Sequence, residues 1–361
     1  MNSSNGMRPS PIVGWQTPSI CAVLVVVVAL VASLGPTSID RTVVTSLGLL
    51  VFALGLHVFS GLSGVVSFGH MGFAVIGGYV TAWMTIPDDT KSTLLPDAPA
   101  WVRDLNASPF VAIVAAGCVA AIAAAVMAAP LMRLSGLPAG LATVALLFIA
   151  ENVARGWLDA TRGSRGLAGV PATTTRDRML IAAVLALFAI WIFQRSRYGV
   201  RLRASSEDER ASEALGVNVR RERSLAFVFS AFVTGVAASL YVQFLGTMTP
   251  GLFFIDLTFV VISMVVLGGI GSMSGAVIGC IIVSTLTELL RRAEAGSLFG
   301  LSIPERPGLT NLGIAFVLVV GLLVRPNGIM NGREFRLRRL RPRATPERPA
   351  SDQNEEPAQV T

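Results

Sequence analysis

Few residues in this sequence could carry protons or bind metal, and those few lie in apolar stretches. The chain has two histidines, His57 and His70, and His70 is the only ionisable residue between Gly61 and Tyr79. A histidine at such a position can carry a proton, although a lone one is more often a hydrogen-bonded interior residue. Two histidines do not make a histidine-rich centre, so we expect no metal site.

The second candidate for chemistry is a pair of opposite charges four residues apart. Glu151 and Arg155 lie near the end of an apolar stretch. An ion pair inside a membrane is by default a functional hypothesis, but this position favours a pair at the membrane surface. The sequence offers no chain of buried carboxylates, which proton-coupled transporters often use. This counts against a secondary transporter.

Enzyme chemistry is disfavoured by what the sequence lacks. There is no GxSxG or HExxH motif, and Lys91 is the only lysine. A Walker A loop needs a Gly-Lys-Ser/Thr run, so this chain does not bind ATP phosphates in the usual way. Its widely spaced cysteines, Cys21, Cys118 and Cys280, lie in apolar runs without a CxxC motif, which predicts buried small side chains.

Composition predicts an all-α polytopic integral membrane protein. The 361 residues are 53% hydrophobic and 14% charged, with a mean hydropathy of +0.66, whereas soluble domains carry about 25% charged residues. A membrane span needs about 20 residues. We expect about ten spans, some of them short or discontinuous, in the apolar stretches 20–34, 42–60, 64–86, 110–129, 138–158, 179–194, 224–246, 253–270, 274–291 and 309–325.

Glycines interrupt or line two of these stretches. Six glycines lie between Gly61 and Tyr79, which weakens a regular helix and predicts a broken one. Gly271, Gly275 and Gly279 recur every four residues, a spacing that lets helix backbones approach closely in lipid. We interpret this second row as tight packing within the subunit in preference to a moving interface.

A polar insert at 200–219 separates two apolar stretches. Ser206 and Glu209 have the spacing of a capping box, and Gly216 would close the helix that they start. The insert predicts either a solvated connector or a helix that docks on a partner protein. Its small apolar face would consist of Ala211, Ala214 and Leu215.

Charge distribution predicts the topology. Arginines crowd both 195–223 and the tail after residue 331, so both belong in the cytoplasm. An even number of spans then separates them, which requires 253–291 to split at 271–274. The aspartate-rich loop 87–109 belongs outside. The loop 159–178 disagrees with the rule that arginine-rich loops are cytoplasmic. Successive loops lie on opposite sides of the membrane, and this alternation places its four arginines outside.

Three regions follow from this reading. Residues 1–19 form a flexible cytoplasmic N-terminus, and residues 20–330 form the transmembrane domain with the cytoplasmic loop 195–223. Residues 331–361 form a disordered arginine-rich cytoplasmic tail that would lie on anionic lipid headgroups. No basic domain suggests nucleic-acid binding.

Four ordered motifs between residues 42 and 330 together resemble the LivM-type permease subunits of branched-chain amino acid ABC importers. Gly61–Tyr79 is similar to the N-terminal signature, and residues 197–218 (RYGVRLRASSEDERASEALGVN) to the coupling segment. Residues 267–279 (LGGIGSMSGAVIG) and 325–328 (RPNG) are similar to the two later motifs. In the first motif, Met71 and Gly72 depart from the pattern.

The resemblance implies a role and partners. A LivH-like second permease would pair with this chain, ABC ATPase subunits would dock from the cytoplasm, and an extracytoplasmic binding protein would deliver substrate at a bacterial inner membrane. ATP and Mg²⁺ would be bound by the ATPase, and this chain would bind no cofactor. The implied coupling helix consists of Glu207, Asp208, Glu209, Ala211, Glu213, Ala214, Leu215 and Gly216. The implied translocation-path or helix-packing residues are Ser67, Gly69, His70, Phe73, Gly77, Gly271, Gly275 and Gly279.

Two alternatives stay open. A permease of a urea or short-amide ABC importer would share these motifs. An ATP-independent channel or secondary transporter would have no need of the insert at 200–219.

Overall fold

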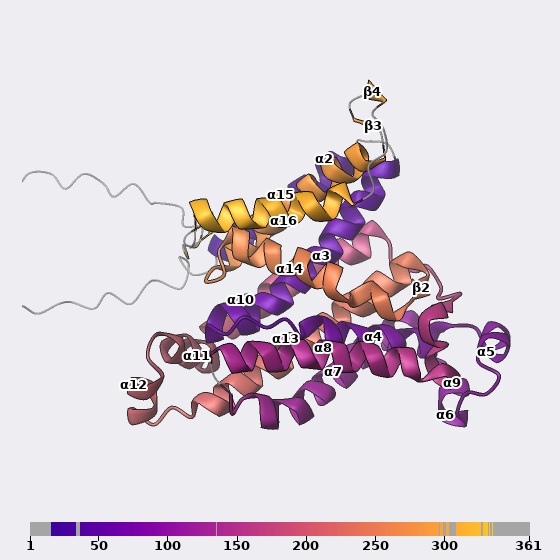
Figure 1. Ribbon diagram of the computed structural model, residues 1–361, viewed down its shortest axis with the longest axis horizontal. Helices are drawn as coiled ribbons and strands as arrows, with labels where there is room; N and C mark the ends of the chain where they lie inside the picture. Colours follow the sequence, from indigo (N-terminus) through magenta and orange to yellow (C-terminus); the bar gives the residue numbers. More distant parts are fainter. Residues whose placement is uncertain are drawn as a thin grey trace, which may run out of the picture.

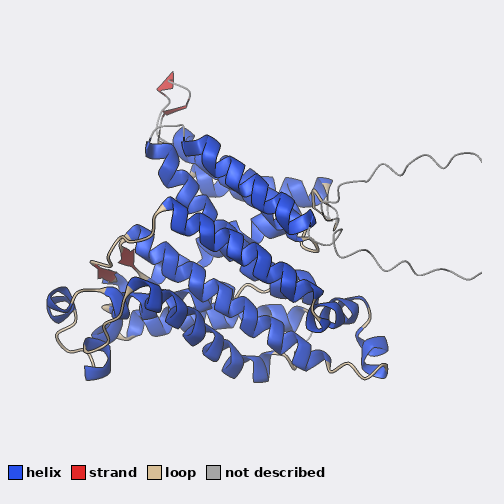
Figure 2. Ribbon diagram, turned by 180° about the vertical axis from the view of Figure 1, so that it is seen from behind, coloured by secondary structure: helices blue, strands red, loops and turns tan. Residues whose placement is uncertain are grey.

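The computed structural model describes residues 16–33, 37–134, 136–295, 297–298, 301–302, 308–325, 328–330, 332 and 334. This part of the chain is almost entirely helical (Figure 2), which confirms the all-α class. The helices are α2 (Gln16–Ser33), α3 (Thr37–Ser63), α4 (His70–Thr85), α5 (Asp88–Leu94), α6 (Ala100–Arg103), α7 (Pro109–Leu131), α8 (Leu137–Gly156), α9 (Leu158–Thr161), α10 (Arg176–Arg195), α11 (Arg197–Glu207), α12 (Glu209–Ala214), α13 (Val219–Leu245), α14 (Ile255–Gly268), α15 (Met273–Glu294) and α16 (Leu309–Val324).

The remaining elements are short. The 3₁₀ turns are η1 (Gly163–Arg165) and η2 (Pro250–Phe253). Strands β1 (Leu167–Ala168) and β2 (Thr247–Met248) pair antiparallel, as do β3 (Ser297–Leu298) and β4 (Leu301–Ser302).

Each of the ten predicted apolar stretches contains a helix. In the described part of the chain, seven helices are long and apolar enough to cross a membrane, and two shorter apolar helices cover Gln16–Val31 and Leu309–Gly321. The remaining stretch, 64–86, contains α4, whose 16 residues span about 24 Å, less than the hydrocarbon core of about 30 Å. The expectation of short segments is confirmed, and helix length alone supports seven crossings.

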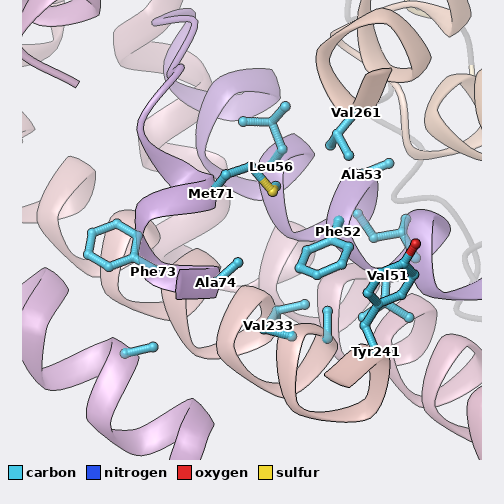
Figure 3. Packing of buried hydrophobic residues seen from close by; sticks show 14 of the residues in the cluster. Val51, Phe52, Ala53, Leu56, Met71, Phe73, Ala74, Val233, Tyr241 and Val261 are labelled. Carbon is cyan, nitrogen blue, oxygen red and sulfur yellow. The ribbon is translucent and has the colours of Figure 1, made fainter. Parts of the chain in front are cut away.

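Helices α3 and α13 form the centre of the molecule, where most of their residues are buried. Phe52 and Tyr241 meet edge to face at 6.0 Å between ring centroids, and Figure 3 shows them beside Val233. The Ser230 hydroxyl donates to the Gly55 carbonyl across the same interface at 2.5 Å. Such a bond ties together helices that have no hydrophobic drive to associate in lipid.

Small residues let α4 and α7 approach α13 closely. A side chain on Gly77 would lie 2.9 Å from the Gly235 Cα atom, so only glycine fits there. Helix α7 buries one alanine every fourth residue against its neighbours and exposes its larger side chains. The buried alanines are Ala112, Ala116, Ala120, Ala124 and Ala128.

The polar segments separate to the two ends of the molecule. Figure 1 shows α11 and α12 at one end and α5, α6 and α9 at the other. The arginine-rich loop 159–178 contains α9 and β1, and Leu167 of β1 pairs with Met248 of β2. It therefore lies at the end opposite α12, as alternation requires. Two of its arginines have partners, because Arg176 binds Asp40 at 3.1 Å and Arg178 donates to the Thr173 carbonyl at 2.6 Å.

Two expectations about the periphery were wrong in part. Helix α2 begins at Gln16, so residues 16–19 are helical, while residues 1–15 lie outside the described residues. Cys21 and Cys280 are buried as expected, but Cys118 is exposed, because the buried alanine stripe occupies the other face of α7. Of the predicted disordered tail, only residues 332 and 334 are described.

Candidate functional site

The polar insert forms two helices, and α12 starts at a different cap from the one expected. Ser206 continues α11, and its hydroxyl donates to the Arg203 carbonyl at 2.7 Å. Asp208 adopts an extended conformation with φ −148°, and its carboxylate accepts from the Ala211 amide at 2.9 Å. The capping box of Ser206 and Glu209 was therefore wrong. Asp208 caps α12, since a serine bonded to its own helix cannot start the next one.

The predicted end of α12 at Gly216 is confirmed. Gly216 has φ +80°, a conformation that favours glycine. Its amide donates to the Glu213 carbonyl at 2.9 Å, and the Val217 amide donates to the Ser212 carbonyl at 3.0 Å. These two bonds make a Schellman motif, which satisfies the last carbonyls of the helix.

Helix α12 leaves its apolar face uncovered. The Leu215 side chain is 86% exposed, and Ala211 and Ala214 are exposed beside it. We define the α12 surface as the exposed residues Glu207, Asp208, Ala211, Glu213, Ala214 and Leu215. A leucine this exposed at the end of a membrane bundle is suited to insert into a groove on a partner protein.

An ion pair holds α12 against the central helix. The buried Arg223 in the first turns of α13 donates from Nη1 and Nη2 to both carboxylate oxygens of Glu209, at 3.1 and 3.0 Å. Arg201 of α11 lies 3.6 Å from the buried Glu222, the residue before Arg223. A bidentate pair fixes orientation as well as distance. The pair therefore ties the first turn of α12 to the start of α13.

Sequence reasoning missed the role of Glu222 and Arg223. Arg223 was counted only as one of many positive charges in the loop. The available signal was the adjacent pair Glu222 and Arg223 at the start of a mostly apolar helix. Charged side chains are rarely buried there without a partner.

The predicted break after Gly61 lies at residues 64–69, between α3 and α4. The Ser67 amide donates to the Ser60 hydroxyl at 3.1 Å, and the Ser67 hydroxyl bonds His70 Nδ1 at 2.7 Å. The His70 ring lies 5.5 Å from the rings of both Phe59 and Phe227. His70 is thus a buried interior residue at the start of α4, with Nδ1 bonded as the sequence favoured and Nε2 without a partner among the described residues.

The other residues of the first motif pack α4 against its neighbours. Phe73 meets Phe227 of α13 at 5.2 Å, and Gly77 approaches Gly235 of the same helix. A side chain on Gly69 would overlap the Thr143 carbonyl of α8. These residues of the first motif therefore pack α4 and the turn before it against α3, α8 and α13, and a role in the translocation path stays a prediction.

The break between α14 and α15 spans residues 269–272, close to the predicted split. Side chains on Gly275 and Gly279 would overlap the carbonyls of Gly268 and Met264, so these two glycines pack α15 closely against α14. Gly271 precedes α15 and does not share their face. The expected row of three glycines was wrong at this position, because the helix starts only at Met273, capped by Ser272.

A second histidine connects this break to the insert. His57 Nδ1 lies 3.0 Å from the Ile270 carbonyl, and its Nε2 lies 2.7 Å from the Gln194 amide nitrogen. A carbonyl only accepts, so Nδ1 carries the proton and Nε2 accepts from Gln194. Gln194 lies two residues before the Ser196 cap of α11. No pattern in the sequence indicates this role of His57.

Residues that follow the C-terminal motif 325–328 also bind this break. The amides of Ile329 and Met330 donate to the carbonyls of Leu267 and Gly268 at 2.9 and 3.0 Å. The Glu334 carboxylate accepts from the amides of Met273 and Ser274 at 2.8 and 3.1 Å. Glu334 thus caps α15, and a carboxylate there also interacts favourably with the helix dipole.

Glu151 and Arg155 form the predicted ion pair on α8. Glu151 is buried and Arg155 is half-exposed, with a further bond of 3.3 Å to the Ser164 hydroxyl. Ser164 lies in the loop 159–178, so the pair is at the end of the span, as expected. In the described part of the chain, no group of three or more His, Cys, Asp or Glu residues could hold a metal ion.

These features define a multi-pass membrane protein with a short, exposed polar helix at one end. Residues 38–323 match the family described as the branched-chain amino acid transport system permease component, and the chain belongs to this family. It is a permease subunit of an ABC importer, of the LivM type.

The relatives are permeases of the same kind. The chain is 25% identical to the high-affinity branched-chain amino acid transport system permease protein LivM of Escherichia coli, covering 86% of this chain and 74% of that protein. It is 30% identical to LivH of the same organism, covering 78% of this chain and 90% of that protein. BraD of Pseudomonas aeruginosa is 30% identical over 46% of this chain and 51% of that protein. No solved structure matches.

Proposed function

We propose that this chain forms half of a membrane pore that imports branched-chain amino acids across the inner membrane of a bacterium. The LivM and LivH relatives carry this substrate class in their names. A second, LivH-like permease would complete the pore. The chain itself performs no catalysis, and ATP with Mg²⁺ would be bound by separate ATPase subunits.

The observation that carries the proposal is the link from the α12 surface to α13. Leu215 is available for a partner, while Glu209 is held by the buried Arg223. An ATPase that grips α12 from the cytoplasm would move α13, which lies at the centre of the helix packing. Residues Glu207 to Gly216 would be the coupling segment, as the sequence motif implies.

The opposite end would receive the substrate-binding protein. It carries the loops 87–109 and 159–178, which lie away from α12 (Figure 1). An extracytoplasmic binding protein would release its amino acid there, and the solute would pass along the interface of the two permeases.

The test is uptake by the complete transporter in liposomes. The permease pair, the ATPase and the binding protein are reconstituted, and uptake of labelled leucine is measured with and without ATP. We expect uptake only with ATP and binding protein. Leu215→Asp should abolish both uptake and ATPase binding, whereas Leu158→Asp, at an exposed leucine of the opposite end, should retain the ATPase.

Other results would point elsewhere. Uptake of urea or a short amide, with none of leucine, isoleucine or valine, would move the chain to the alternative importer class. Uptake by this chain without ATP would overturn the ABC importer assignment. It would also leave α12 without a role in docking the ATPase.

A further inference from the structure

An apolar groove runs along the membrane face of the molecule between α10 and α13. Both helices pack on α3, which contributes Val51 to the groove, and α7 lines it as well. The groove has a volume of about 380 Å³. Its principal walls are Ile181, Leu185 and Ala189 of α10 and Phe232, Val236 and Leu240 of α13.

The groove has the length of one lipid leaflet. On α10 it extends from Arg178 to Ala189, twelve residues that span about 16 Å. This is close to half of the hydrocarbon core, which is about 30 Å thick. Helix α10 starts at the end opposite α12, so the groove lies in the leaflet of that end. At the end of the groove toward α12, Phe229 of α13 lines it and stacks on Phe193 of α10 at 4.9 Å.

A cation lies at the open end of the groove. Arg178 is exposed, and one of its nitrogens donates to the Thr173 carbonyl at 2.6 Å. Within the described residues no carboxylate lies within 4.0 Å of it, whereas its neighbour Arg176 binds Asp40. The guanidinium keeps further donors in the fork geometry that matches a phosphate.

We propose that this groove binds an anionic phospholipid, with one acyl chain between α10 and α13 and the phosphate on Arg178. A helix of the same 16 Å length occupies on the order of 1,200 Å³, several times the groove volume, whereas a single chain is thin enough to enter. The apolar walls suit the chain, and the charge at the open end suits the headgroup. The bound lipid would fill the gap between two helices that both pack on α3.

The experiment is native mass spectrometry of the assembled transporter with added phosphatidylglycerol or phosphatidylcholine. We expect phosphatidylglycerol to be retained at one molecule per copy of this chain. Arg178→Glu and Ala189→Phe, which remove the cation and fill the groove, should each lower that retention at least fivefold. Arg178→Lys should keep most of it. Arg162→Glu, at an arginine of the same end outside the groove, should leave it unchanged.

A second measurement needs no variant. Phosphatidylglycerol with a photoreactive acyl chain is cross-linked to the wild-type transporter, and labelled peptides should come from 181–189 and 232–240. Equal retention by Arg178→Glu and wild type, or labels distributed over all membrane helices, would overturn the proposal. So would a disulfide between a cysteine placed at Leu185 and the second permease, because a partner helix would then occupy the groove.

Discussion

Arg223 and Glu209 lie 14 residues apart and bind each other through two parallel hydrogen bonds of 3.1 and 3.0 Å. The arginine is buried in the start of α13, and the glutamate lies in the first turn of α12. The pair converts a six-residue helix, which would be unstable alone, into a rigid extension of the central helix.

Breaking this pair should uncouple the transporter. Arg223→Gln leaves Glu209 without its bidentate partner, and because Glu209 is half-exposed we expect a loss of about 2 kcal/mol, less than for a fully buried pair. Leucine uptake should fall more than tenfold, while ATP hydrolysis continues. The ratio of leucine imported to ATP hydrolysed measures this. Arg221→Gln, at the exposed neighbour, is the control, and an unchanged ratio in Arg223→Gln would exclude the link.

The cap of α12 can be tested with a matched pair of variants. Asp208→Ala removes the acceptor of the Ala211 amide and should cost about 1 kcal/mol. Amide hydrogen exchange over 209–215 should then speed up about fivefold. Ser206→Ala should leave exchange there unchanged, because this hydroxyl bonds only within α11. Faster exchange in Ser206→Ala and unchanged exchange in Asp208→Ala would show that Ser206 caps α12.

Two glycines near the second break should respond differently to alanine. Gly279→Ala would force a methyl group into the Met264 carbonyl and should cost about 3 kcal/mol. Gly271→Ala has its nearest neighbour at 3.8 Å and should cost less than about 0.5 kcal/mol. Thermal stability of the purified complex distinguishes them, and similar losses for both would contradict the packing of α14 on α15.

The Glu334 cap predicts a sharp boundary for truncation. A chain ending at residue 330 loses the carboxylate that binds the Met273 and Ser274 amides, so it should lose about 1 kcal/mol of stability. A chain ending at residue 340 keeps the cap and should match the full-length protein. Equal melting temperatures for both truncations would show that the cap contributes nothing.

Lys91 should make stability depend on alkaline pH. Burial lowers the pKa of its ammonium group, partly offset by Asp88 and Asp104. The unfolded chain then binds more protons than the folded one between the two pKa values, so stability rises as pH increases through the folded pKa toward about 10.4. Lys91→Gln removes this contribution. The difference in melting temperature between wild type and variant, followed from pH 7 to 10, measures it, and a constant difference would contradict the shift.

Much of the fold could be predicted because its signals are local. The ten apolar stretches, the break near Gly61 and the αL glycine at Gly216 depend on hydropathy and turn chemistry within a few residues. The cap was wrong for the same reason. Ser206 and Glu209 have the correct spacing, but α11 extends through Ser206 and leaves Asp208 at the junction.

The sequence by itself determined the helical membrane class, the position of the polar insert and the family motifs, because each depends only on residues that are close together in the chain. Only the tertiary structure decided that His57 joins Gln194 to the Ile270 carbonyl, 137 and 213 residues away. It also decided that Glu334 caps α15 and that Arg223 is buried against Glu209. Hydrogen bonds between distant segments depend on how helices pack, and packing follows from the contacts of all helices together, which no local pattern contains.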